Sequence, residues 1–249
     1  MKTLRNAIVK HSTALILLST FTATNAAVVM TGTRVIFPAS QNEKSVQLQN
    51  KDSNPNIVQV WLDKGDESST PETANAPIVA NPQIFKMAPN QGQVVRLIFT
   101  EDKSTLPQDR ESIFYMNFSE IPASKDNNAE KNKLMLVFKN RVKVLYRPDR
   151  LPVPPQDIAK SITYQWVGSN SNQKIILHNQ SPYYASFADL SITSNGQKKL
   201  IAKNEMIAPF SSKEWKYSTN TTNTNATVSL SLINDYGVTV PNDLSLYKE

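Results

Sequence analysis

The sequence predicts an all-β protein built from two β-sandwich domains. Beyond residue 26, the chain consists of short runs rich in β-branched and aromatic residues, and Asn, Asp, Ser and Pro bound these runs, as is typical of strands and turns. Regular short strands with polar turns favour β-sandwiches, and no helical period of useful length is present. A proline-rich stretch at residues 148–155 divides the chain.

Short alternating or apolar runs place eight strands along the chain. These runs are residues 46–49, 57–62, 94–99, 113–118, 134–138, 142–146, 174–177 and 228–233. Because the chain contains only 6 glycines, Asn, Asp and Pro are expected to form most of its turns. The Asn/Thr-rich stretch at residues 219–227 is expected to be a solvated loop.

Residues 1–26 have the order of a secretory signal peptide. Lys2, Arg5 and Lys10 give a basic start, an apolar core follows at residues 14–18, and small residues end the segment. The apolar core is too short to span a bilayer, so cleavage after Ala26 is expected instead of membrane anchoring.

Length and proline content predict the domain boundaries. Removal of the leader leaves about 223 residues, enough for two domains of about 110 residues each. The prolines prevent residues 148–155 from forming a central strand, so this stretch is expected to be a stiff linker between domains at 27–147 and 156–249. No later segment is long and apolar enough to insert into a membrane.

Composition excludes several kinds of function. The formal net charge of +6 falls to about +3 without the leader, which does not indicate nucleic-acid binding. The chain has 0 cysteines, which excludes thiol catalysis and thiolate metal sites. A secreted protein of this kind must depend on its apolar cores for stability.

Residues 134–138 form an expected strand that is apolar on both faces, and a polar loop at 123–133 precedes it. One face, with Met135 and Val137, is expected to pack in the chain's own sandwich, so the other face needs a second cover. The pattern leaves two interpretations open. The strand is either a central strand buried on both sides, or an exposed strand that is added to another protein's sheet.

Five segments carry a family signature. In chain order they read TRVIFP at 33–38, LPQDRESIFYMN at 106–117 with EIP at 120–122, RVKVLYRP at 141–148, NQSPYY at 179–184 and INDYG at 233–237. With these segments the chain resembles the PapD-like periplasmic pilus chaperones. The modest loop and the missing cysteine pair resemble the short-loop branch, closest in appearance to the chaperones of type 1 fimbriae. Several long motifs in one order are more specific than one short motif.

The resemblance implies two immunoglobulin-like domains set at an angle, with a cleft between them. It implies a periplasmic chaperone of chaperone–usher fimbrial biogenesis, which lends a strand to the open groove of a pilus subunit and delivers the subunit to an outer-membrane usher. The implied partners are pilus subunits and the usher, and no cofactor or metal is implied. Capping of the exposed strand by a second copy, as a homo-oligomer, is an alternative that the sequence leaves open for the free protein.

The resemblance assigns roles to three groups of residues. They are Arg34 and Lys143, which hold the subunit's C-terminal carboxylate; Leu134, Leu136 and Phe138, which form the donated strand; and Glu111, Arg147 and Asp235, which form a salt-bridge network between the domains. An arginine fork and a lysine point charge suit a carboxylate, and the spacing of the donor residues places them on one face. The network is expected to fix the angle of the cleft.

Two other classes of protein remain as alternatives. A secreted hydrolase needs a nucleophile, a base and an orienting group, but His178 is the one histidine beyond the leader and lies at an expected strand end. No metal-ligand cluster, phosphate loop or nucleophile elbow is present, so the chain is not expected to be an enzyme. A secreted immunoglobulin-like fibre subunit or adhesin is expected to be one incomplete domain, whereas this sequence predicts two complete domains.

Overall fold

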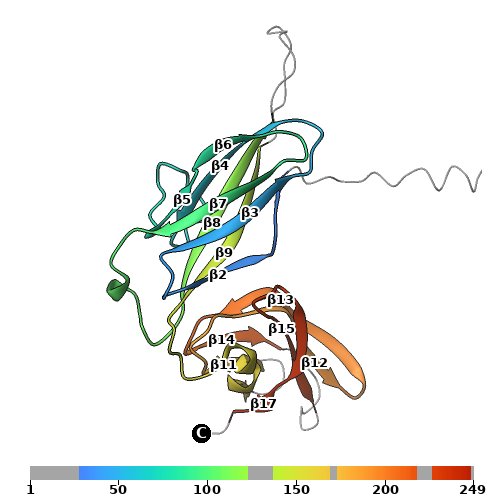
Figure 1. The fold of residues 1–249 in the computed structure, drawn as a ribbon. Helices are drawn as coiled ribbons and strands as arrows, with labels where there is room; N and C mark the ends of the chain where they lie inside the picture. The colour runs from blue at the N-terminus through green and yellow to red at the C-terminus, as the bar shows by residue number, and fades with distance from the viewer. Residues whose placement is uncertain (1–27, 123–136, 169–172, 218–225, 248–249) are drawn as a thin grey trace, which may run out of the picture.

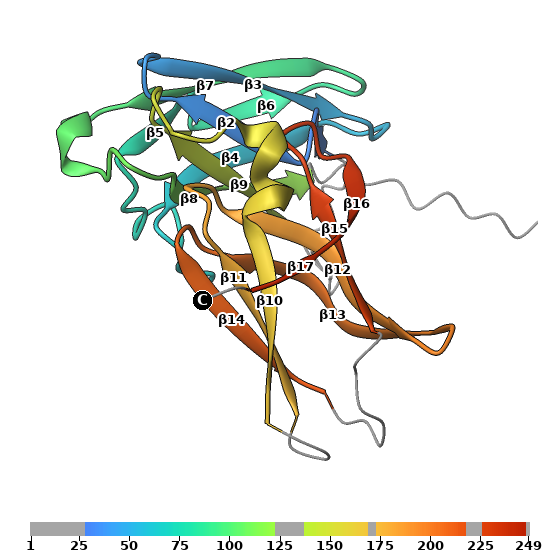
Figure 2. The ribbon, with the colours of Figure 1, turned by 90° about the horizontal axis from the view of Figure 1, so that it is seen from below.

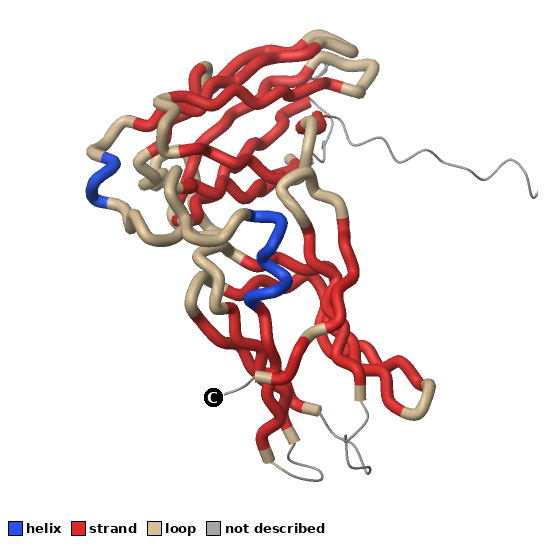
Figure 3. The backbone as a smooth tube through the Cα atoms, turned by 60° about the horizontal axis from the view of Figure 1, so that its bottom comes forward, coloured by secondary structure: helices blue, strands red, loops and turns tan. Residues whose placement is uncertain are grey.

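The protein consists of two β-sandwiches that meet at an angle and are joined by a short elbow (Figure 1). The computed structural model describes residues 28–122, 137–168, 173–217 and 226–247. Figure 3 shows that strands make up most of this described chain and that the two short 3-10 helices lie in connections.

The elements follow one another as β1 (Val28–Met30), β2 (Arg34–Pro38), β3 (Glu43–Asn50), β4 (Asn56–Asp63), β5 (Ile78–Asn81), β6 (Ile84–Met87), β7 (Gly92–Phe99), η1 (Lys103–Thr105), β8 (Ser112–Pro122), β9 (Phe138–Arg147), η2 (Pro155–Ser161), β10 (Ile162–Val167), β11 (Lys174–Asn179), β12 (Ala185–Ser194), β13 (Gln197–Ile207), β14 (Ser211–Lys216), β15 (Thr227–Ile233), β16 (Thr239–Asp243) and β17 (Ser245–Leu246).

The first domain packs a sheet of order β1-β3-β7-β5 against a sheet of order β2-β9-β8-β4-β6. Its strand pairs are antiparallel except for β2 and β9, which run parallel. Alternating side chains of both sheets form one buried core, in which Phe37 and Tyr146 are fully buried and their ring centroids lie 6.1 Å apart. β2 and β9 therefore contribute to the core with one face and leave the other face for further contacts.

The second domain packs a sheet of order β14-β11-β10-β17 against a sheet of order β13-β12-β15-β16. Its core includes Leu177, Phe187, Leu190 and Leu230. Figure 2 shows η2 leading from the elbow into β10. Each domain thus has its own apolar core, as expected for a protein without cysteine.

Seven of the eight predicted strand segments lie within β3, β4, β7, β8, β9, β11 and β15, and these predictions are confirmed. Of the eighth, at 134–138, residues 134–136 lie outside the described residues, and its last residue, Phe138, begins β9. The long strands β12 and β13 were not predicted. β13 escapes a pattern search because it is an edge strand with several exposed lysines, so its apolar alternation is weak.

Asparagine forms turns that glycine usually forms, as predicted. Asn90 and Asn195 lie in turns and have positive φ angles of 58° and 51°. Asn204, within β13, also has a positive φ angle, of 53°. Asn adopts this left-handed conformation more readily than most residues with a β-carbon. Within the four described ranges, no helix has the length and apolarity needed to cross a membrane.

The core assignment predicts a contrast between two apolar residues of the first domain. Phe37 is 0% exposed and Val94 is 48% exposed. Phe37→Ala is expected to lower the free energy of unfolding by about 3–5 kcal/mol, because it leaves a cavity. Val94→Ala is expected to change it by about 0.5 kcal/mol or less. Urea unfolding followed by tryptophan fluorescence measures both values, and equal losses would contradict the assignment.

Candidate functional site

Two cations meet where the first domain faces the second. Arg34 begins β2, Lys143 lies in β9, and the parallel register of the two strands pairs these residues directly. Arg34 Nη1 donates a hydrogen bond to the backbone oxygen of Ile233 at 3.0 Å, and Lys143 Nζ donates to Ser186 Oγ at 3.2 Å. The two predicted anchor residues therefore lie side by side, and each also contacts the second domain.

The surroundings of this pair favour a negative charge. Burial lowers the pKa of Lys143, and the neighbouring charge of Arg34 lowers it further. Burial also lowers the pKa of Arg34, although the carboxylates of Asp235 and Glu111 oppose this effect. Arg34 Nε is buried and has no hydrogen-bond partner among the described residues. An anion bound between the two cations would satisfy this donor and offset the repulsion.

Arg147, the last residue of β9, joins the two domains. Its Nε donates to Glu111 Oε1 at 2.8 Å, and its Nη1 and Nη2 donate to the two oxygens of Asp235 at 2.6 and 2.8 Å. Glu111 Oε2 accepts the backbone N–H of Tyr184 at 2.9 Å. Burial alone would lower the pKa of Arg147, but its bonds to Asp235 and the charge of Glu111 outweigh burial and raise this pKa.

The loop that carries Asp235 fits closely against the first domain. Asn234 Oδ1 accepts the backbone N–H groups of two later loop residues at 3.0 and 2.9 Å. Gly237 has a φ angle of +81°, and a β-carbon there would lie 2.4 Å from Thr33 Oγ1. Glycine is therefore required both by the backbone conformation and by the close approach of the two domains.

One edge of β9 is only partly covered. β9 pairs with β8 from Phe138 to Tyr146, whereas β2 covers its other edge only from Lys143 to Arg147. Along Phe138–Val142 this edge has no strand partner within the described parts of the chain. The free edge ends where the cation pair begins.

Phe138, a predicted donor residue, begins β9 and is 59% exposed. Because side chains alternate along a strand, Phe138 falls on the same face as Val144 and Tyr146, which are buried in the core. The other two predicted donor residues, Leu134 and Leu136, lie outside the described residues.

Val137 contradicts the prediction that its face packs in the chain's own sandwich. Its side chain is 52% exposed. Even-numbered residues of β9, such as Val144 and Tyr146, face the core, so the odd-numbered Val137 projects to the opposite side. The apolar run alone could not reveal this, because both of its faces are equally apolar.

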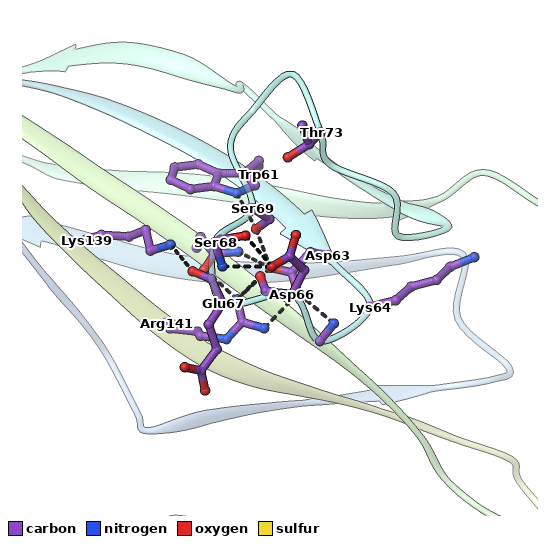
Figure 4. Close-up of polar contacts among 12 residues, drawn as sticks. Trp61, Asp63, Lys64, Asp66, Glu67, Ser68, Ser69, Thr73, Lys139 and Arg141 are labelled. Atoms are coloured by element: carbon purple, nitrogen blue, oxygen red, sulfur yellow. Dashed lines mark hydrogen bonds and ion pairs between the residues drawn. The ribbon is translucent and has the colours of Figure 1, made fainter.

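A buried polar cluster on the first domain was not predicted (Figure 4). The carboxylate of Asp63 accepts hydrogen bonds from Arg141 Nη1 and Nη2 at 2.6 and 2.7 Å, from Asn117 Nδ2 at 2.6 Å and from Ser69 Oγ at 2.8 Å. The Asp63 side chain is 0% exposed. We call these four residues the Asp63 cluster.

Charge and hydrogen bonding keep Asp63 ionised. Burial raises the pKa of Asp63, but the hydrogen bonds from Arg141, Asn117 and Ser69 outweigh burial and lower the pKa to about 2. Basic residues at positions 139, 141 and 143 are a sequence signal for charged contacts on one face of β9. Asp63 lies 78 residues before Arg141, and no local pattern connects the two.

His178, the candidate base of the hydrolase alternative, lies in β11. Its Nδ1 is 2.7 Å from Ser212 Oγ, and its ring centroid is 4.4 Å from that of Tyr247. His178 Nε2 is buried and has no hydrogen-bond partner in the described chain. Nor do the described residues hold a group of three or more His, Asp or Glu side chains that could bind a metal ion.

The class of protein follows from two immunoglobulin-like sandwiches that meet at an elbow, where Arg147 bonds to Glu111 of the first domain and Asp235 of the second. The N-terminal domain of the pili and flagellar-assembly chaperones, PapD, matches residues 27–152, and the C-terminal domain of the pili assembly chaperone PapD matches residues 157–244. This chain belongs to the PapD-like family of pilus-assembly chaperones, and it is a fimbrial chaperone by this relationship.

The sequences of individual relatives align with most of this chain. The probable fimbrial chaperone YadV of Escherichia coli K12 is 36% identical over 234 residues, which cover 92% of this chain and 94% of the relative. The chaperone protein HifB of Haemophilus influenzae is 32% identical over 216 residues, with coverage of 86% and 85%.

Solved structures show the same arrangement of domains. The crystal structure of the YadV chaperone has a TM-score of 0.74 and 34% identity, and it covers 88% of this chain and 100% of that chain. One chain of the Salmonella enterica complex between the SafA pilin and the SafB chaperone has a TM-score of 0.70 and 25% identity, with coverage of 90% and 99%.

The interdomain network predicts unequal effects for two carboxylates of one segment. Glu111→Ala is expected to cost about 3–5 kcal/mol of folding stability, because Arg147 stays buried with one partner fewer. It is also expected to loosen the angle between the domains. Asp109→Ala removes an exposed pair with Arg110 and is expected to have little effect. Urea unfolding and small-angle X-ray scattering test both variants, and identical behaviour would refute the prediction.

The Asp63 cluster predicts an acid dependence of stability. The pKa of Asp63 is about 2 in the folded protein and 3.8 ordinarily, so its contribution is complete above about pH 4 and disappears as the pH falls toward 2. This shift corresponds to about 2–3 kcal/mol. Asp63→Asn is expected to lower the free energy of unfolding at pH 7. The variant's free energy of unfolding is also expected to fall less steeply below pH 4 than that of wild type. Urea unfolding between pH 2 and 7 measures this, and parallel curves would exclude it.

Proposed function

We propose that this protein is a periplasmic chaperone of chaperone–usher fimbrial biogenesis, which caps pilus subunits by donor-strand complementation and delivers them to an outer-membrane usher. The observation that carries the proposal is the free edge of β9, which ends at the pair of Arg34 and Lys143. In this proposal the exported chain begins at Ala27, and residues 148–155 link domains at 27–147 and 156–249.

The free edge determines the direction of a bound strand. A subunit strand whose terminal carboxylate lies at Arg34 and Lys143, and which pairs with Phe138–Val142, must run parallel to β9. β2 already pairs with β9 in this direction on the same edge. The bound strand would therefore end where β2 begins, and together they would complete the pairing of β9.

The cation pair supplies an anchor for the carboxylate. An arginine fork binds both oxygens, and a lysine adds a point charge. Arg34 Nε has no hydrogen-bond partner among the described residues, and the pKa of Lys143 is lowered; both observations support a site that gains from an anion. Anchoring the last residue sets the register of the bound strand, because a shift by one residue would turn its side chains to the wrong face.

The face of the donated strand matches its proposed task. Phe138 projects on the same side as the core residues of β9 but lies beyond the cover of its own sandwich. An incomplete subunit sandwich placed against the free edge would bury this side chain, so the two apolar cores would become continuous. Leu134 and Leu136 are proposed to extend the same face.

The comparisons support a subunit as the partner. The relative SafB is a chaperone seen in complex with the SafA pilin, and its fold is shared by this chain. The outer-membrane usher is proposed as the receiving partner from the family resemblance alone. Capping by a second copy remains an alternative use of the same edge when no subunit is present.

We also propose that the protein has no enzymatic activity. Ser212 contacts His178 Nδ1, but a catalytic triad needs a carboxylate on the other ring nitrogen, and none is hydrogen-bonded there in the described chain. The fibre-subunit alternative is less favoured, because each described domain has two packed sheets with its own core. His178→Ala is accordingly expected to leave subunit capture unchanged.

The anchor can be tested by co-expression in the periplasm with a candidate fibre subunit encoded by a neighbouring gene. Arg34→Ala and Lys143→Ala are each expected to weaken the binding free energy for the subunit by about 2–5 kcal/mol, because the carboxylate loses a buried charged partner. Both variants should therefore fail to capture the subunit. Lys86→Ala, a change of an exposed lysine on β6, serves as the matched control. Affinity purification measures capture, and circular dichroism shows that each variant is folded.

A second comparison isolates the carboxylate itself. A synthetic peptide of the subunit's C-terminal segment is expected to bind wild type as the free acid and to bind much more weakly as the amide. Equal binding of acid and amide, or full capture by both folded anchor variants, would rule out the carboxylate anchor. Failure of wild type to capture any subunit from its own gene cluster would refute the chaperone proposal.

A further inference from the structure

The Asp63 cluster joins β9 to β4 across β8 (Figure 4). It lies on the face of the sheet opposite the core, at the level of the free segment of β9 but on the side away from its free edge. The Arg141 guanidinium bonds to Asp63 and lies 4.0 Å from the ring centroid of Tyr115. Two residues earlier, Lys139 Nζ donates to the backbone oxygen of Glu67 at 2.6 Å. These two side chains connect the free segment of β9 to the end of β4 and to the loop that follows it.

The free segment needs such a connection. Among the described residues, Phe138–Val142 have a strand partner on one edge only, so the described chain gives their backbone half the hydrogen bonds of an internal strand. A shift of this segment by one residue would turn Phe138 away from the core face. The two parallel bonds from Arg141 to Asp63 oppose movement along the strand, and the contact with Tyr115 opposes rotation about it.

Both terminal nitrogens of Arg141 are hydrogen-bonded within the chain, and its side chain is only 18% exposed. Besides Asp63, its Nη1 donates to Asn117 Oδ1 at 3.0 Å and to the backbone oxygen of Asp66 at 3.2 Å. The ammonium group of Lys143, on the same face of the strand, makes one hydrogen bond among the described residues, to Ser186 of the second domain. Along one face of β9, position 143 is therefore left to bind a partner, and position 141 holds the strand in place.

We propose that Arg141, acting through Asp63, is a positioning residue that sets the register and facing of Phe138–Val142 for an incoming strand of a pilus subunit. This inference rests on the proposed function and adds to it a residue that does not touch the subunit. The competing explanation is that the Asp63 cluster only ties residues 64–69 to the sheet. The two explanations differ in which backbone segment loosens when the ion pair is removed.

The first experiment uses the chain alone. The double variant Asp63→Asn/Arg141→Gln removes both charges, so that no buried charge is left without a partner. Arg141→Lys keeps the charge but loses the two-pronged geometry, and it serves if the double variant is unstable. Hydrogen exchange is measured for the amides of residues 138–142, 64–69 and, as an internal reference, β11 in the second domain.

Amides of residues 138–142 that are protected in wild type are expected to exchange about tenfold faster or more in the double variant, with β11 unchanged. Arg141→Lys is expected to give an intermediate rate. Arg96→Gln, which removes an exposed arginine 3.6 Å from Glu43, is the matched control and is expected to match wild type. Wild-type exchange at 138–142 in either folded Arg141 variant, with faster exchange only at 64–69, would overturn the inference.

The second experiment reads the register in the complex. The chain has 0 cysteines, so Phe138→Cys introduces a single reactive site, and single cysteines are placed in turn along the subunit groove. One dominant disulfide is expected with Arg141, and a spread over neighbouring positions is expected with Arg141→Lys. If the protein with Arg141 and the Arg141→Lys variant both capture the subunit and form the same dominant disulfide, the inference is overturned and the proposed function stays intact. Loss of capture by wild type would refute the proposed function, while hydrogen exchange still decides the positioning role.

Discussion

Arg147 shares its charge between Glu111 of the first domain and Asp235 of the second through three hydrogen bonds. The junction depends on this interaction, because the loop that holds Asp235 also presents the backbone oxygen of Ile233 to Arg34. A buried network of this kind adds little net stability, but it favours one arrangement of the groups that it joins. The loop that carries Asp235 therefore takes part both in the interdomain network and in the surroundings of the cation pair.

β9 shows how a single strand serves two purposes through alternation. Its even-numbered side chains enter the core, from Val144 onward, and reach beyond the sandwich at Phe138. Its odd-numbered side chains at 139, 141, 143 and 147 are all basic. The first two contact the end of β4 and the loop after it, Lys143 contacts Ser186, and Arg147 contacts Glu111 and Asp235. The period of two separates apolar contacts from charged contacts without any additional element of structure.

Strands with a clear alternation of apolar and polar residues could be predicted from the sequence. Features whose burial depends on residues far away in the chain could not. β4 and β8 could be recognised from alternation, but the edge strand β13 could not, since its lysines face solvent. The positions of Arg34 and Lys143 followed from the family resemblance and not from any pattern. Asp63 was missed because a buried aspartate is indistinguishable from a loop residue until the fold brings Arg141 to it.

Arg34 and Lys143 both bond to the second domain, at Ile233 and at Ser186. A rotation at the elbow would change these distances, so the cation pair and the elbow are mechanically coupled. Coupling of this kind is reciprocal: a carboxylate that binds one elbow angle better also stiffens the elbow at that angle. Under the proposed function, a change of the elbow angle would therefore weaken the hold on a bound carboxylate without any contact at the rest of the bound strand.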